Sequence, residues 1–293
     1  MKKIFLLLVF FLFLSACSAI AEETAETTAL IEQARAAIEA GDFETAVPLL
    51  QKAANAGDAL ACFYLGHCYG YGWGVDQDPG KAADYYRLAA DRGLAGAQYE
   101  LGVMYHLGKG VEQDYEKAFH YYGLAAAQDY PEALTAIGFL YNQGLGTQQN
   151  LDEMLKYYNR AAEYGEPMAL FNLGCCYRDG TGVEQDYEKM LEYFRLAVEK
   201  ENANAQFNLG YAYYVGMGVD PDDNEALRLF RLAADQEFPN AMFAVGDCYY
   251  LGRGVEKDLG AAAEWYQKAL DAGYEPDEED RKHLEDVLGK QLN

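Results

Sequence analysis

The chain has 293 residues, of which 51% are hydrophobic, and its formal net charge at pH 7 is −24. Nucleic-acid binding needs a basic surface, so this balance argues against nucleic acid as a partner, and equally against direct docking on anionic lipid headgroups. A strongly charged surface keeps an elongated protein dispersed, and it is compatible with a basic partner without requiring one.

The first 17 residues predict an export signal. Lys2 and Lys3 precede an apolar run, Ile4 to Leu14, that is too short to cross a bilayer as a helix. The end of this run, Leu14-Ser15-Ala16-Cys17, resembles the lipobox of bacterial lipoproteins. The resemblance implies that residues 1–17 are a lipoprotein signal segment and that Cys17 is lipidated. The protein would then be anchored at the outer membrane, in the periplasm or at the cell surface.

An alternative cleavage site follows closely. Ala19-Ile20-Ala21 has the small-residue pattern of ordinary signal cleavage, which would release a soluble secreted protein. Residues 18–28 are polar, acidic and small, so they predict a flexible tether in either case.

A dipeptide of one aliphatic residue and glycine recurs every 36 residues along most of the chain. The six copies are Leu65-Gly66, Leu101-Gly102, Ile137-Gly138, Leu173-Gly174, Leu209-Gly210 and Val245-Gly246. A tyrosine follows each glycine by three residues, and a Gly-x-Gly follows the tyrosine, as in Tyr105 and Gly108-Lys109-Gly110. A fixed period of this length indicates a stack of identical helical or strand units, and such stacks are mostly binding surfaces.

Residues 95–130 illustrate the predicted unit. Ala97 to Leu107 has apolar residues at helical spacing, and the Gly-x-Gly ends this helix because glycine adopts left-handed conformations readily. Asp114 stands at an N-cap position before a second helix over residues 115–128. The helix-internal Gly102 costs about 1 kcal/mol relative to alanine, so we expect the two helices to approach closely there. Paired alanines on the second helix, such as Ala125-Ala126, are the expected matching small surface.

The motif resembles the Sel-1-like repeat family, relatives of tetratricopeptide repeats, whose pattern is A-x-x-x-L-G-x-x-Y-x-x-G-x-G-V-x-x-D-x-x-x-A-x-x-Y-Y-x-x-A-A. Residues 97–126 match it almost throughout, and the resemblance covers roughly residues 43–273. Departures are modest: Thr147 replaces the valine, Met154 and Met190 replace an alanine, and Leu229-Phe230 replaces the aromatic pair. The resemblance implies an all-α protein, a right-handed α-solenoid of stacked antiparallel helix pairs.

We therefore expect one continuous solenoid over residues 29–290. It comprises a shorter pair over residues 29–56 that is more similar to a plain tetratricopeptide repeat, and a polar capping helix over residues 277–288. Between them we expect six Sel-1-like helix pairs, over residues 59–92, 95–128, 131–164, 167–200, 203–236 and 239–272.

The resemblance also implies a ligand site on the concave face, which the first helix of each pair lines. Three positions per repeat should face this groove. The first set is Phe63, Tyr99, Thr135, Phe171, Phe207 and Phe243. The second set is His67, Val103, Phe139, Cys175, Tyr211 and Asp247. The third set is Gly70, His106, Asn142, Arg178, Tyr214 and Tyr250.

The first set is nearly uniform, so its members are either aromatic shelves between repeats or ligand contacts. The other two sets vary, and variation within a constant framework is where specificity can be placed. Aromatic residues with Arg178 and few other charges suit an extended peptide, but also suit stacking on a glycan.

The cysteines predict buried thiols rather than a disulfide framework. Cys68, Cys176 and Cys248 occupy one phase of repeats about 10 Å apart, beyond the roughly 4.4–6.8 Å Cα separation of a disulfide. Cys62 and Cys68 lie six residues apart on one predicted helix, and a Cys175–Cys176 bridge would be strained. Small apolar fillers are the expected role.

The inventory of reactive residues argues against an enzyme. Serine occurs only at positions 15 and 18, and His67 and His106 lie a repeat apart, too far to share one zinc ion. Cysteine-rich relatives of the family are associated with β-lactam chemistry, but their regular cysteine pairs are not present here. We therefore expect a non-catalytic, monomeric scaffold without cofactor or metal, which binds a protein or peptide in the envelope and meets the membrane only through its lipid. The alternatives are an envelope enzyme of the β-lactamase-like kind and a peptidoglycan or glycan binder.

Overall fold

The structure is a computed structural model that describes residues 25–289, and every regular element in this range is an α-helix. The predicted signal segment, Cys17 and residues 18–24 of the predicted tether lie outside the described residues. A helix over residues 25–39 comes first. It is followed by α2 (Phe43–Asn55), α3 (Ala59–Tyr71), α4 (Pro79–Ala90), α5 (Ala95–Leu107), α6 (Tyr115–Ala126), α7 (Pro131–Gln143), α8 (Leu151–Glu163), α9 (Pro167–Asp179), α10 (Tyr187–Glu199), α11 (Ala203–Val215), α12 (Asp223–Ala234), α13 (Pro239–Leu251), α14 (Leu259–Asp271) and α15 (Glu278–Leu288).

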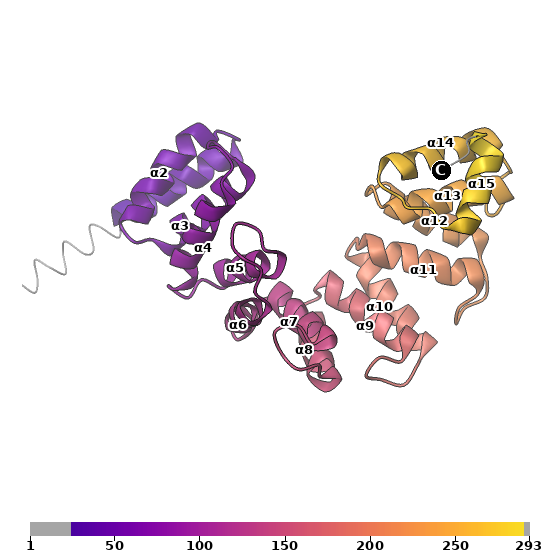
Figure 1. The fold of residues 1–293 in the computed structure, drawn as a ribbon, viewed down its shortest axis with the longest axis horizontal. Helices are drawn as coiled ribbons and strands as arrows, with labels where there is room; N and C mark the ends of the chain where they lie inside the picture. The colour runs from indigo at the N-terminus through magenta and orange to yellow at the C-terminus, as the bar shows by residue number, and fades with distance from the viewer. Residues whose placement is uncertain (1–24, 290–293) are drawn as a thin grey trace, which may run out of the picture. The chain divides into compact units, whose positions relative to one another are not determined.

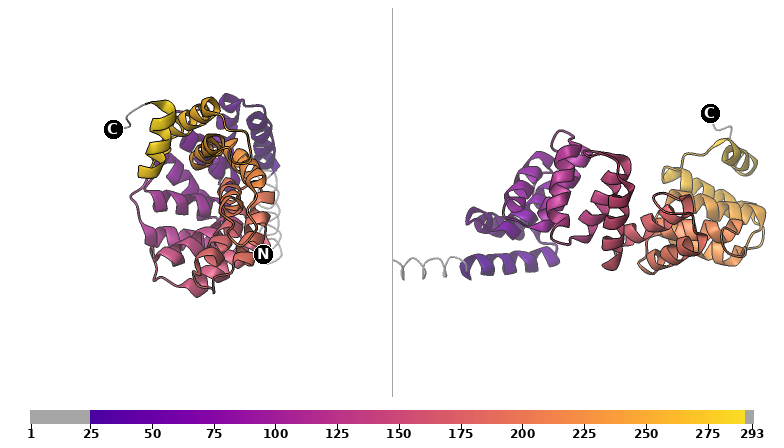
Figure 2. Two further views of the ribbon diagram at one scale, coloured as in Figure 1. Left: turned by 90° about the vertical axis from the view of Figure 1, so that its right-hand side faces the viewer. Right: turned by 90° about the horizontal axis from the view of Figure 1, so that it is seen from below.

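These helices form two compact units that meet in sequence between Gln149 and Asn150. The first unit contains α2 to α7 and the second contains α8 to α15. Within each unit, consecutive helices pack as neighbours, for example α3 with α4 and α13 with α14 (Figures 1 and 2). The predicted all-α class of stacked helix pairs is confirmed. None of the described helices combines the length and apolar character that a membrane crossing requires.

The second helix of each pair begins at its predicted cap. Asp114 accepts a hydrogen bond from the Lys117 backbone N–H at 3.0 Å, and Asp78, Asn150, Asp186, Asp222 and Asp258 act in the same way. An N-cap of this kind contributes about 1 kcal/mol to helix stability.

The two glycines of each Gly-x-Gly have different roles. Gly108 ends α5 in the left-handed conformation, with φ of 68°. Gly110 also has a positive φ, and a Cβ there would collide with the backbone of Pro79, at the start of α4 in the preceding pair. The turn is therefore both a helix connector, as expected, and a backbone contact between successive pairs.

The helix-internal glycine makes room for an aromatic ring. A Cβ added at Gly102 would lie 2.6 Å from the Tyr122 ring, and equivalent rings cover Gly66, Gly174, Gly210 and Gly246. The close approach is confirmed, but the nearest atoms belong to this ring and not to the paired alanines. The expectation about alanines was wrong because an aromatic side chain of the second helix projects into the glycine gap. These side chains are Tyr86, Tyr122, Phe194, Phe230 and Tyr266.

The described cysteines are free thiols, as expected. Cys62, Cys68, Cys176 and Cys248 are buried, and Cys175 is half-buried. Burial raises the pKa of the Cys68 thiol to about 11 and that of Cys248 to about 12. Such thiols remain protonated at neutral pH, which suits a packing role and not a nucleophilic one.

We expect Gly102→Ala to destabilise the first unit by about 1–3 kcal/mol, because the added methyl group overpacks against Tyr122. Gly123→Ala is the matched control, since this α6 glycine has no neighbour closer than the Ile137 side chain at 3.9 Å. Alanine there should raise the free energy of unfolding by up to about 1 kcal/mol. Urea unfolding of both variants measures the difference, and equal effects would contradict the assigned role of the glycine.

Candidate functional site

The aromatic members of the first predicted groove set pack against the second helix of their own repeat. Each aromatic member contacts the ring that fills the glycine gap of its own repeat. These pairs are Phe63–Tyr86, Tyr99–Tyr122, Phe171–Phe194, Phe207–Phe230 and Phe243–Tyr266, with ring centroids 4.8–5.9 Å apart. Thr135, at the remaining position, is buried. The first set therefore belongs to the repeating framework of ring contacts.

Two members of the second set bind a tyrosine hydroxyl from the paired helix. His67 Nδ1 lies 3.0 Å from the Tyr86 hydroxyl, and Asp247 Oδ1 accepts from Tyr266 at 2.7 Å. Burial lowers the pKa of His67, which favours its neutral imidazole. In these two repeats, the variable residue is therefore hydrogen-bonded to the tyrosine that fills the glycine gap.

Other variable residues make contacts of their own. His106 stacks on Phe139 with centroids 5.9 Å apart, and Val103 and Asn142 are half-buried on the same helices. Cys175 packs beside a buried cluster around Met190, and Tyr250 donates to Asp286 at 2.8 Å.

Arg178 is held by neighbouring side chains. Its guanidinium donates to both carboxylate oxygens of Asp179 at 2.8 and 2.9 Å, and to Asn208 at 2.8 Å. The cation that the sequence placed in the groove is therefore balanced by an adjacent carboxylate.

Five predicted residues converge on one cavity in the second unit. Phe207, Tyr211, Tyr214, Phe243 and Asp247 line a cavity of about 180 Å³ together with Phe230, Asn240, Ala244, Tyr274 and Asp280. Most of the lining comes from α11 and α13, the first helices of successive pairs. We call this cavity the aromatic pocket.

Asp247 is a half-buried carboxylate of the aromatic pocket. Besides the Tyr266 hydroxyl, its Oδ1 lies 3.1 Å from His283 Nδ1 on α15. Burial raises the pKa of Asp247, while the hydrogen bonds from Tyr266 and His283 oppose the shift.

Tyr274 and Asp280 also line the aromatic pocket, and neither is among the groove residues predicted from the sequence. Tyr274 stacks on Phe243 at 4.5 Å and donates to Asp280 Oδ2 at 2.5 Å. A sequence signal existed for Tyr274. Phe238 follows Phe207 by 31 residues and packs on the Phe207 ring, with centroids 5.5 Å apart. Tyr274 follows Phe243 by the same 31 residues. Asp280 belongs to the capping segment after the last repeat, so no equivalent residue in another repeat could have indicated it.

Tyr211 also borders a second cavity of about 410 Å³, whose lining includes Arg178, Asn208 and Tyr187. The Tyr211 side chain is 46% exposed, which is high for a large aromatic residue. The aromatic pocket and this cavity therefore flank one exposed ring on α11.

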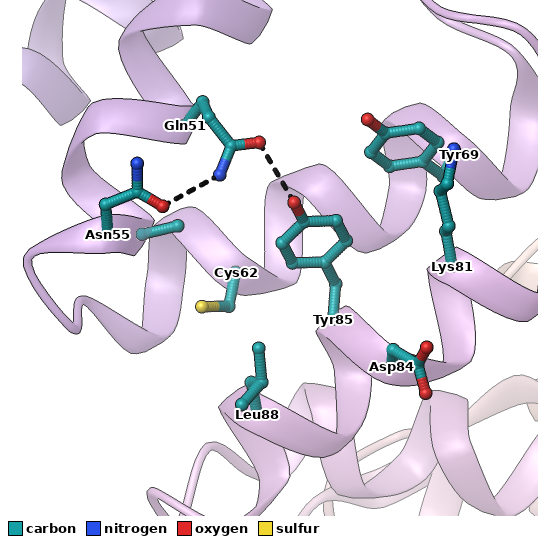
Figure 3. A pocket seen from close by; sticks show the side chains of 9 residues that line it. Gln51, Asn55, Cys62, Tyr69, Lys81, Asp84, Tyr85 and Leu88 are labelled. Carbon is teal, nitrogen blue, oxygen red and sulfur yellow. Dashed lines mark hydrogen bonds between the residues drawn. The ribbon is translucent and has the colours of Figure 1, made fainter.

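A cavity of about 420 Å³ in the first unit lies among α2, α3 and α4 (Figure 3). Asn55, Gln51 and Tyr85 form a hydrogen-bonded chain along it, with distances of 3.0 and 2.9 Å. None of the predicted groove residues lines it. Its stacked Tyr69–Tyr85 pair recurs as Tyr105–Tyr121 and Tyr177–Tyr193, so we assign it to the framework.

The first unit also carries a continuous strip of aromatic rings, in which Phe43, Trp73, Tyr71 and His67 stack in turn and His67 meets Phe63 edge-on. Successive centroid distances are 5.2 Å for Phe43–Trp73, 4.8 Å for Trp73–Tyr71, 5.9 Å for Tyr71–His67 and 4.5 Å for His67–Phe63. Tyr71 is 55% exposed and Trp73 is 41% exposed. Only His67 and Phe63 were predicted. Trp73 is the middle residue of the Gly-x-Gly in its repeat, a position that holds no tryptophan in the other five copies. This difference was the sequence signal for it.

The aromatic pocket combines aromatic rings with carboxylates. Asp247 and His283 form a carboxylate–imidazole pair, but residues 25–289 contain no serine and no cysteine lines the aromatic pocket. Within the same residues, no group of three histidine, cysteine, aspartate or glutamate side chains is arranged to hold a metal ion. The arrangement instead offers aromatic faces and carboxylate oxygens to a ligand.

Solved structures contain close likenesses of this chain. A Sel1 repeat protein from Oxalobacter formigenes is 33% identical with a TM-score of 0.78, and the match covers 83% of this chain and 99% of that one. Protein c5321, a protective antigen present in uropathogenic Escherichia coli strains, is 29% identical with a TM-score of 0.69, covering 91% of this chain and 58% of that one. Immunity protein Pa5087 from Pseudomonas aeruginosa shares the fold at 22% identity and a TM-score of 0.53, with 73% and 81% covered.

No curated protein sequence matches the chain. The Sel1 repeat model matches seven segments, at residues 36–58, 59–94, 95–130, 131–165, 167–202, 203–238 and 239–274. The first segment overlaps the predicted helix pair of residues 29–56, at residues 36–56. Proteins built from these repeats are typically non-catalytic protein-interaction modules. The chain belongs to the Sel1 repeat family, which its 36-residue period and its stacked helix pairs had indicated.

Proposed function

We propose that this protein is a non-catalytic, monomeric scaffold of the bacterial envelope that holds a segment of a partner protein along the first helices of its repeats. The observation that carries the proposal is the aromatic pocket, where predicted groove residues from α11 and α13 meet around the exposed Tyr211. Aromatic residues that fill or rim a partly desolvated pocket are the usual energetic centres of protein interfaces.

The size of the aromatic pocket favours a side chain over a whole small molecule. Sites for drug-sized ligands enclose about 300–1,000 Å³, and this cavity has about 180 Å³. One amino-acid side chain fits such a volume, while the neighbouring cavity beside Arg178 has room for adjoining residues of the same segment. Because both cavities border Tyr211, an extended peptide could place successive side chains in them as it crosses this ring.

The envelope location rests on the sequence outside the described residues. The lipobox-like Leu14-Ser15-Ala16-Cys17 supports a lipid anchor. The description of c5321 as a protective antigen is compatible with an exported position for a similar chain. Under this proposal the anchor leaves the acidic repeat region free to meet partners.

A photoreactive phenylalanine analogue in place of Tyr211 should form discrete cross-linked adducts in living cells, because this ring lies at the proposed contact. The same analogue at Leu232, an exposed α12 residue that lines neither cavity of the second unit, is the matched control. Gel shifts and mass spectrometry identify the adducts. Adducts that are equally abundant at both positions, or absent at Tyr211, would count against the proposed groove.

Lipidation has a separate test. Cells that express the full chain should incorporate radiolabelled palmitate into it, and Cys17→Ala should abolish the label because the thioether-forming thiol is gone. Mass spectrometry of the mature N-terminus is the control. An unlabelled protein that begins at Glu22 would instead establish release as a soluble protein.

A second candidate function, binding of a peptidoglycan or other glycan, is favoured by the aromatic strip of the first unit. Flat exposed rings such as Trp73 and Tyr71 are suited to stacking on sugars. Under this alternative, the protein co-sediments with protein-free sacculi, and Trp73→Ala lowers the affinity at least about fivefold, as loss of a major aromatic contact does. Tyr211→Ala is the control and should bind normally. Absence of co-sedimentation would remove the alternative.

A further inference from the structure

The aromatic pocket has an unusual combination of walls. Phe207, Phe230 and Phe243 provide apolar surface, and the tyrosines at 211, 214 and 274 add further rings. Two carboxylates, Asp247 and Asp280, stand among these rings, while no lysine or arginine of the described chain lines the cavity. Aromatic faces and carboxylates both attract cations.

Each carboxylate presents an oxygen that the protein itself does not use. Both hydrogen bonds to Asp247 fall on Oδ1, from Tyr266 and His283. Asp280 receives the Tyr274 hydroxyl and the Asp277 backbone N–H on Oδ2. Among residues 25–289, no hydrogen bond reaches Oδ2 of Asp247 or Oδ1 of Asp280.

The negative charge in the aromatic pocket is only partly balanced. The two carboxylates repel each other, which adds to the effect of burial on Asp247. His283 is the basic group that contacts Asp247, and its imidazole carries a charge only when it is protonated. Arg253 lies nearby on the Tyr214 ring, but its charge is paired with Asp223 at a Nε–Oδ1 distance of 2.8 Å.

Arg253 shows what the pocket can recognise. Its guanidinium lies 3.5 Å from the centroid of the Tyr214 ring and pairs with a carboxylate at the same time. The aromatic pocket offers the same two elements, rings and carboxylate oxygens, facing a cavity. A flat guanidinium can stack on a ring and donate to two oxygens, whereas an ammonium is a compact point charge.

We propose that the aromatic pocket receives an arginine side chain of the bound partner, with the guanidinium between the aromatic rings and paired with Asp247 and Asp280. The inference rests on the proposed peptide-binding function and names the chemistry of the residue that occupies its centre. The net charge of −24 favours a basic partner segment over an acidic one.

Local structure is the competing explanation for the two carboxylates. Asp280 and Asp277 exchange hydrogen bonds at the start of α15, and Asp247 anchors Tyr266. The amide variant Asp247→Asn/Asp280→Asn separates the two roles, since an asparagine oxygen can still accept these bonds but carries no charge. A merely structural role would leave ligand binding unchanged in this variant.

The probe is N-acetyl-arginine methylamide, titrated into the full chain with labelled tyrosine rings and followed by NMR. We expect saturable shifts of the Tyr211 and Tyr214 signals, with Kd on the order of a few millimolar. The neutral isostere N-acetyl-citrulline methylamide should bind at least about tenfold more weakly, and the lysine analogue several-fold more weakly, because neither supplies a charged planar fork.

The double amide variant should also weaken the arginine probe at least about tenfold, with an unchanged thermal unfolding midpoint. Asp220→Asn/Asp235→Asn is the matched control, because it removes the same charge from exposed positions that do not line the pocket, and it should bind like the unaltered protein. If the double amide variant is destabilised, the citrulline comparison on the unaltered chain decides instead.

Equal binding of arginine and citrulline, tighter binding of lysine, or full affinity of a folded double amide variant would overturn the inference. Absence of saturable shifts together with cross-linking at Tyr211 would overturn it too, and would leave the proposed scaffold function standing. Failure of both measurements would remove the scaffold function at this groove as well.

Discussion

The repeat depends on one contact, in which an aromatic ring from the second helix of a pair lies over a glycine inside the first. Gly102 and Tyr122 are one instance, and Gly174 with Phe194 is another. A helix-internal glycine costs about 1 kcal/mol, and burial of a large aromatic side chain returns about 1.5–3 kcal/mol. The same ring packs against an aromatic side chain of the first helix, as Tyr122 does against Tyr99. One ring therefore sets both the distance between the two helices and the position of this groove residue.

The same contact admits polar variation. Where the ring is tyrosine, its hydroxyl meets His67 in one repeat and Asp247 in another. A buried hydroxyl without a partner would cost about 1–3 kcal/mol, so these pairs allow a functional polar group to stand on the framework without that loss. Where the ring is Phe230, the equivalent position is the exposed Tyr211. Framework and groove are therefore linked position by position.

The last repeat differs because the array ends there. The capping helix α15 lies against the final pair (Figure 1). Its Leu284 is fully buried there, and its His283 meets Asp247. Tyr274 occupies the place on Phe243 that Phe238 occupies on Phe207. A capping segment must cover apolar surface in any repeat array, and here it also introduces acidic groups beside aromatic rings. The aromatic pocket therefore differs from the other repeats because the capping segment contributes to its lining.

Much of the fold could be predicted from residues at fixed phases. Asp114 as an N-cap, Gly108 as a helix end and the separation of Cys68 from its equivalents are consequences of local geometry and of a constant 36-residue period, which a linear sequence displays directly. Only the tertiary structure decided that Tyr122, and not the paired alanines, fills the glycine gap, since this depends on the direction in which side chains project between helices. It also decided that Asp179 and Asn208 hold Arg178 and that Tyr274 and Asp280 join the pocket. Tyr274 keeps the register of Phe238, but the contacts of Arg178 depend on side-chain packing. Asp280 belongs to a segment beyond the last repeat, where periodicity carries no information.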